Sequence, residues 1–165
     1  MPLEDSGIVR WVIKEFIRRD SSRLFVIAVI LNYPWERVQS SFYLTNDGTA
    51  IPWWHCMLAS LGDGLLVLLM FWAGRVIFGH PGWFDRPGLR GYLLMALIGL
   101  VMIIPLEWIM ISRMKWWSYT ADMPLIPGIA VGISPVAQML LLPPLICWIA
   151  AMWRKKSCPD PRQVV

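Results

Sequence analysis

Four long apolar stretches constrain this sequence more than any other feature. They run over residues 24–44, 53–78, 91–111 and 129–153, and each reaches the roughly 20 residues that a membrane-spanning helix needs. Their apolar residues form continuous blocks and do not alternate with polar ones, which argues against spanning strands. The whole chain is 57% apolar and only 16% charged. We therefore predict an all-α polytopic membrane protein with four transmembrane helices.

The positive charges lie on one side of this predicted topology. Twelve of the fifteen Lys and Arg residues fall before the first span, beside the second connection or after the fourth span. The first connection, 45–52, has none, and the third, 112–128, has only Arg113 and Lys115. By the positive-inside rule both termini are predicted to be cytoplasmic, in a bacterial inner membrane. Because topology accounts for the net charge of +4, we expect no nucleic-acid partner.

The first 23 residues form a segment of their own. Ile8, Val12 and Phe16 recur every four residues, and Arg10 and Lys14 fall on another face. This pattern predicts a short amphipathic helix on the cytoplasmic membrane surface, with an ordinary solvated helix as the alternative. The predicted organisation is thus an N-terminal segment, 1–23, a transmembrane domain, 24–153, and a basic cytoplasmic tail, 154–165.

Three carboxyl groups lie inside the predicted spans. They belong to Glu36, Asp63 and Glu107. An ionisable group in the membrane costs about 2.5 to 3.5 kcal/mol on insertion scales, so it is first interpreted as functional. These three residues are the candidate catalytic groups. If Glu36 and Asp63 are desolvated together, we expect one of them to hold a proton at neutral pH.

Each carboxyl group also has a purely structural interpretation. Glu36 would pair with the neighbouring Arg37 or Gln39, and Asp63 would hydrogen-bond to Asn32 and hold two helices together. Glu107 would reach the outer interface and meet Arg113 or Lys115. The structural interpretation is favoured for Glu107 because its predicted depth is shallower.

Polar residues of the first span share one face of a helix. Asn32, Glu36, Gln39 and Tyr43 are spaced by four, three and four residues, which keeps them within a narrow stripe. Their depth predicts a polar, outward-facing cavity in the outer half of the bundle, covered by residues 115–124. The candidate substrate-binding residues are Asn32, Trp35, Gln39, Tyr43, Trp117, Tyr119 and Gln138.

Tryptophans concentrate at the predicted ends of the spans. This distribution is typical of an aromatic belt at the membrane interface. The residues assigned to the belt are Trp53, Trp54, Trp83, Trp108, Trp116, Trp117 and Trp153.

Metal and cofactor signatures are missing from the sequence. The two histidines, His55 and His80, are predicted to lie on opposite sides of the membrane, so they cannot share a metal ion. The sequence contains no phosphate loop, nucleophile elbow or dinucleotide fingerprint. We predict no metal site and no soluble cofactor.

Two family resemblances come from the polar and aromatic residues. The chain resembles small uncharacterised bacterial four-helix integral membrane proteins, a likeness that implies no activity. Residues 117–135 also resemble the heterodimeric lycopene cyclases, membrane proteins that protonate a polyene with buried acids. The acidic pair that follows the proline in that family is replaced here by Ala137 and Gln138. The first resemblance rests on Asn32, Trp35, Glu36, Gln39, Gly62, Asp63, Trp117, Tyr119, Met123, Pro124, Pro135 and Gln138.

These observations favour an intramembrane pocket that binds or processes a lipid-like or isoprenoid molecule. The sequence leaves open whether the protein is an enzyme. One alternative is a small proton-linked transporter or permease, for which four spans without an inverted repeat would require a dimer. The other is a non-catalytic accessory subunit of a membrane complex. The expected partners are membrane lipid and a second copy or a larger membrane complex.

Overall fold

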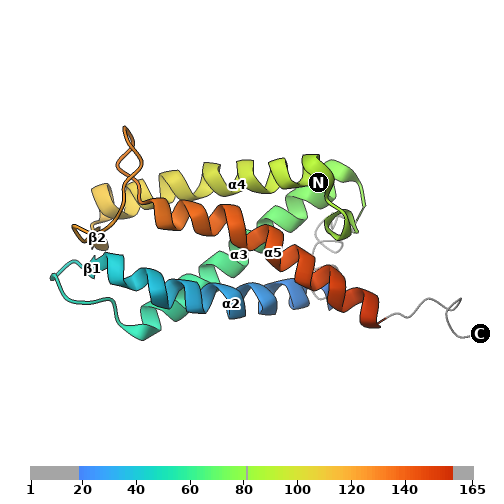
Figure 1. Cartoon of the computed structure of the whole chain (residues 1–165), viewed down its shortest axis with the longest axis horizontal. Helices are drawn as coiled ribbons and strands as arrows, with labels where there is room; N and C mark the ends of the chain where they lie inside the picture. Colours follow the sequence, from blue (N-terminus) through green and yellow to red (C-terminus); the bar gives the residue numbers. More distant parts are fainter. Residues whose placement is uncertain (1–18, 81, 158–165) are drawn as a thin grey trace, which may run out of the picture.

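The computed structural model describes residues 19–80 and 82–157. It is mostly helical and contains four long helices: α2 (Arg19–Gln39), α3 (Trp53–Phe78), α4 (Gly88–Ile109) and α5 (Ile133–Ser157). The helices run along the long axis of the molecule, with α2 packed between α3 and α5 and with α5 against α4 (Figure 1). The predicted interfacial helix falls mainly on residues 1–18, which lie outside the described residues.

Three of the helices are long and apolar enough to cross a membrane. They cover Trp53–Phe78, Gly88–Met114 and Ile133–Trp153, so three of the four predicted spans are confirmed in type and approximate position. The span predicted over 53–78 matches α3 at both ends. Helix α2 is 21 residues long, but Asp20, Arg23, Glu36 and Arg37 interrupt its apolar surface.

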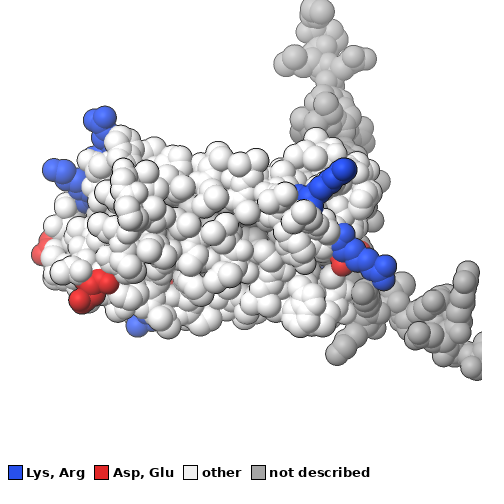
Figure 2. Space-filling view, turned by 45° about the horizontal axis from the view of Figure 1, so that its top comes forward, with Lys and Arg blue, Asp and Glu red and all other residues white. Residues whose placement is uncertain are grey.

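Charged side chains gather at the two ends of the long axis. On the face seen in Figure 2, the broad middle of the molecule is almost free of Lys, Arg, Asp and Glu. A band of this kind is what the hydrocarbon interior of a bilayer requires, because unpaired charge is costly there.

The boundaries of the other three helices differ from the predicted spans. Helix α2 begins five residues before Leu24 and ends at Gln39, after which Tyr43 lies in a short strand. Helix α4 continues into a π-helical turn, Met110–Met114. Helix α5 begins at Ile133, four residues later than predicted, because Gly128 and Ala130 have positive φ values of 89° and 52° that a right-handed helix cannot contain.

A small β-ribbon closes the end of the bundle opposite the α3–α4 connection (Figure 1). Strands β1 (Tyr43–Thr45) and β2 (Trp117–Tyr119) pair in antiparallel register, with Tyr43 opposite Tyr119. The sequence analysis did not predict this ribbon. Each strand is three residues long, too short to produce a visible alternating pattern.

The larger of two apolar clusters fills the half of the bundle nearest the α3–α4 connection, and a smaller one lies between α3, α4 and α5 around Met70, Ile103 and Met139. Leu24, Phe71, Trp83 and Ile146 are buried together in the larger cluster. Trp83 is only 3% exposed and donates a hydrogen bond from Nε1 to the carbonyl of Phe71 at 3.0 Å, so its assignment to the aromatic belt was wrong. Gly74 leaves room for it, since a Cβ there would lie 2.3 Å from the Trp83 ring.

Candidate functional site

A cavity of about 550 Å³ occupies the half of the bundle next to the β-ribbon. All four long helices and both strands contribute to its wall, which is largely apolar. The three carboxyl groups singled out in the sequence line it together. The lining residues are Glu36, Gln39, Ser40, Tyr43, Ile51, His55, Cys56, Leu58, Ala59, Gly62, Asp63, Leu65, Leu66, Ile103, Leu106, Glu107, Met110, Trp116, Trp117, Pro135 and Gln138.

Gln138 of α5 connects the polar groups of α2 and α3. Its Nε2 lies 2.8 Å from Asn32 Oδ1, 2.8 Å from Glu36 Oε1 and 2.7 Å from Asp63 Oδ2. An amide nitrogen has two hydrogens, so it cannot satisfy three acceptors fully at once. Gln138 and Asn32 are 2% and 1% exposed. The arrangement therefore concentrates acceptors around one buried donor.

The carboxyl groups of Glu36 and Asp63 both lie within hydrogen-bond distance of the same Gln138 nitrogen, at 2.8 and 2.7 Å. Two ionised carboxylates this close would repel each other, and one proton on the pair would remove that repulsion. The geometry thus places two carboxyl groups side by side between α2 and α3.

A second network surrounds Glu107 on α4. Tyr119 donates to Glu107 Oε2 at 2.8 Å, and Tyr43 donates to the same oxygen at 3.3 Å. Tyr43 in turn accepts a hydrogen bond from Gln39 Nε2 at 3.4 Å. Gln39 Oε1 accepts hydrogen bonds from Trp35 and Ser134, both at 2.8 Å. The network therefore ties the β-ribbon to α2, α4 and α5.

Tyr119 remains a hydrogen-bond donor over the physiological range. Burial and the neighbouring Glu107 carboxyl raise the pKa of Tyr119, so its hydroxyl keeps its proton. The same oxygen accepts the backbone N–H of Gly132 at 2.9 Å. Tyr119 thus holds the loop before α5 against α4 and closes the cavity at this end.

The cavity opens sideways through the outer surface of α3. Leu58 and Leu65 both line it, yet they are 54% and 56% exposed. Between them lies Gly62, where an added Cβ would have no neighbour within 4 Å. Because Leu58 and Leu65 belong both to the cavity wall and to the exposed surface of α3, the cavity is open to the outside of the bundle beside them.

Carboxyl groups dominate the electrostatics of the cavity. Among the described residues no Lys or Arg lines it, and His55 is its one basic side chain. Arg37 is exposed and donates to Cys56 Sγ at 3.7 Å rather than to Glu36. Glu107 is 4% exposed and bonded to the two tyrosines, so its predicted pairing with Arg113 or Lys115 was wrong.

The cavity does not include every predicted binding residue. Gln39, Tyr43, Trp117 and Gln138 line it, but Asn32, Trp35 and Tyr119 lie behind the wall. These three act through hydrogen bonds to Gln138, Gln39 and Glu107. The indole Nε1 of Trp117 is buried beside the Glu107 carboxyl.

Sequence reasoning missed most of the apolar wall. His55, Trp116 and the α4 residues Ile103, Leu106 and Met110 line the cavity. Apolar residues in a span face either lipid or protein, and nothing in their spacing marks the ones that border an internal cavity. A signal was available for Trp116, since the sequence analysis placed its loop above the cavity.

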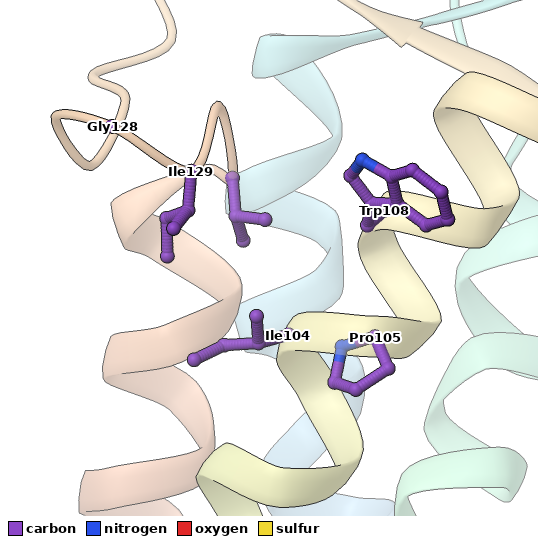
Figure 3. A pocket seen from close by; sticks show the side chains of 6 residues that line it. Ile104, Pro105, Trp108, Gly128 and Ile129 are labelled. Atoms are coloured by element: carbon purple, nitrogen blue, oxygen red, sulfur yellow. The ribbon is translucent and has the colours of Figure 1, made fainter.

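A separate apolar groove lies on the other side of α4. Ile104, Pro105 and Trp108 on α4 face the loop that carries Gly128 and Ile129 (Figure 3). It has a volume of about 330 Å³ and contains no ionisable side chain. Of the two pockets, only the carboxyl-lined cavity therefore has ionisable side chains in its wall.

The described residues contain no group of three or more His, Cys, Asp or Glu side chains placed to hold a metal ion. No protein-family model matches the sequence, and neither a curated protein nor a solved structure matches it significantly. The two family resemblances stay predictions. Any functional conclusion must therefore come from the cavity itself.

Proposed function

We propose that this chain is a four-span integral membrane protein whose cavity binds a lipid-like or isoprenoid molecule. The observation that carries the proposal is the cavity of about 550 Å³ with a polar end and an apolar body. Binding sites for small molecules have this composition, with a mostly apolar wall and a few polar groups that fix orientation. The volume also falls in their usual range of roughly 300 to 1,000 Å³.

The side opening supports a ligand that comes from the membrane. Leu58, Gly62 and Leu65 lie on a helix that is long and apolar enough to span a bilayer. An apolar tail passing over Gly62 would stay in a hydrocarbon environment throughout. Its polar end would reach Glu36 and Asp63, which lie deeper in the same cavity.

The same arrangement supports α2 as the fourth span. Its carboxyl Glu36 faces Gln138 and Asp63 within the bundle, as expected for an ionisable group at membrane depth. With four spans and the charge distribution of the sequence, both termini would be cytoplasmic and the β-ribbon would lie on the outer side of a bacterial inner membrane.

Analysis of co-purifying lipid tests the proposal. The full chain is purified in a mild detergent, and the bound molecules are identified by native mass spectrometry. We expect one apolar or amphiphilic molecule per chain, and we expect Gly62→Trp to displace it because the indole fills the opening.

Leu69→Trp is the matched control. Leu69 is on the same helix and 48% exposed, but it does not line the cavity, so this variant should keep the ligand. Equal loading of the wild type and Gly62→Trp would contradict the proposal.

A further inference from the structure

The polar end of the cavity points to the charge of the ligand. We infer that the cavity selects an amphiphile with a cationic head group, such as an amine or a quaternary ammonium, and releases a proton when this ligand binds. The inference rests on the proposed function and names its substrate class.

The first argument is the set of charged and titratable groups around the polar end. Helix α2 contributes Glu36, α3 contributes Asp63 and His55, α4 contributes Glu107 and β1 contributes Tyr43. Three of these five are acids, and no Lys or Arg among the described residues lines the cavity to neutralise them. A phosphate or carboxylate head group would meet three acids and, among the described residues, His55 as the one basic side chain.

The second argument is that the hydrogen-bond donors beside the acids already have acceptors. Gln138 Nε2 already faces three acceptors, and both tyrosine hydroxyls are directed to one oxygen of Glu107. An ammonium group supplies positive charge where the wall supplies acceptors, and charge-assisted hydrogen bonds are the strong ones.

The third argument is the aromatic part of the wall. Tyr43, Trp116 and Trp117 line the cavity, and Tyr43 contacts both the Trp117 ring and Glu107. The face of an aromatic ring attracts a cation, most strongly where water is excluded. A quaternary ammonium, which has no N–H to donate, would use these rings together with the carboxylates.

Proton release follows from the carboxyl pair. Glu36 and Asp63 both face the Gln138 nitrogen, and we infer that one proton on the pair limits the repulsion between them. A cation placed beside the pair supplies the neutralising charge, so the proton is no longer needed and leaves to solvent. The step is an exchange of one positive charge for another: ligand cation plus carboxyl gives the ion pair plus one proton.

Isothermal titration calorimetry of the full chain in phosphatidylcholine nanodiscs tests the inference. The probes are dodecyltrimethylammonium, dodecanol and dodecyl sulfate, which share one tail, with empty nanodiscs as the blank. Titration in two buffers of different ionisation enthalpy counts the protons released. Dodecyltrimethylammonium carries no exchangeable proton, so any proton counted comes from the protein.

We expect dodecyltrimethylammonium to bind at least about tenfold more tightly than the other two probes, since a desolvated contact between a cation and an aromatic ring is worth about that much. About one proton should be released per cation. The double variant Glu36→Gln, Asp63→Asn should lose both effects, and Asp122→Asn, which changes an exposed carboxylate outside the cavity, should lose neither.

The remaining outcomes separate the two proposals. Equal binding of all three probes, abolished by Gly62→Trp, would leave the amphiphile cavity standing and overturn the cationic head group. Cation binding that survives the double variant would overturn it as well. If Gly62→Trp abolishes the binding of none of the three probes, both the inference and the proposed function are overturned.

Discussion

Glu36 on α2 and Asp63 on α3 share the amide nitrogen of Gln138 on α5, at 2.8 and 2.7 Å. Three helices thus meet at one pair of acids inside the bundle. Removing charged groups from water is costly unless they are paired and hydrogen-bonded. The shared donor allows the two acids to remain at this depth.

Loss of the shared donor should destabilise the bundle. Gln138→Leu leaves Glu36, Asp63 and Asn32 without their common partner, and an unsatisfied buried polar group costs about 1 to 3 kcal/mol. We expect a lower midpoint of thermal unfolding in detergent. Ser134 lies on α5, as Gln138 does, and Ser134→Ala removes one hydrogen bond to Gln39 of α2. This variant should have a smaller effect. A Gln138→Leu variant as stable as the wild type would show that the amide is not a structural link.

Tyr119 should hold the end of the bundle closed. Tyr119→Phe removes the hydrogen bonds to Glu107 and Gly132, each worth about 0.5 to 1.5 kcal/mol net. Hydrogen exchange should become faster in β1, β2 and residues 120–132, while the α3–α4 connection is unchanged. Tyr92→Phe, at a 44% exposed tyrosine of α4, should exchange like the wild type. Unchanged exchange in Tyr119→Phe would contradict this role.

Two glycines of α3 should respond oppositely to alanine. In Gly74→Ala the new methyl would lie 2.3 Å from the Trp83 ring, and overpacking of this kind costs about 1 to 3 kcal/mol. In Gly62→Ala it meets nothing within 4 Å, and the higher helix propensity of alanine should stabilise by up to about 1 kcal/mol. Thermal unfolding of the two variants measures the difference. A Gly74→Ala variant that is more stable than Gly62→Ala would show that the Trp83 ring does not pack against Gly74.

The topology is testable by cysteine labelling in a background without the native cysteines. Thr49→Cys and Asp122→Cys, both exposed beside the β-ribbon, should react with an impermeant thiol reagent added outside intact cells. Arg86→Cys, in the α3–α4 connection, should react only after the membrane is opened. Labelling of Thr49→Cys and Asp122→Cys from different sides would exclude four spans.

Sequence reasoning predicted the elements of this fold better than their contacts. The limits of α3 were predicted correctly because its apolar stretch ends where the helix ends, at Pro52 and at Gly79, which takes the left-handed conformation typical of a helix C-cap. The polar stripe on α2 was visible because helical spacing is a local property. Its extension to Tyr43 failed as helix geometry, although the Tyr43 hydroxyl still reaches Gln39 from the strand.

Contacts between distant segments could not be predicted from one sequence. Tyr43 and Glu107 are 64 residues apart, and Gln138 and Glu36 are 102 apart. Spacing along a helix says which residues share a face but not which face of another helix they meet. The interpretation of Glu107 as a shallow surface group failed for this reason, because its two tyrosine partners come from a ribbon that the sequence pattern did not show.

Photo-crosslinking tests most directly whether a membrane amphiphile occupies this cavity. An alkyl amphiphile with a diazirine in its tail is bound to the full chain in nanodiscs, illuminated, and located by peptide mass spectrometry. We predict crosslinks concentrated on 58–66 of α3 and 103–110 of α4, and their loss in Gly62→Trp but not in Leu69→Trp. Crosslinks spread evenly over the lipid-facing surfaces of α3, α4 and α5, and unchanged by Gly62→Trp, would contradict the account.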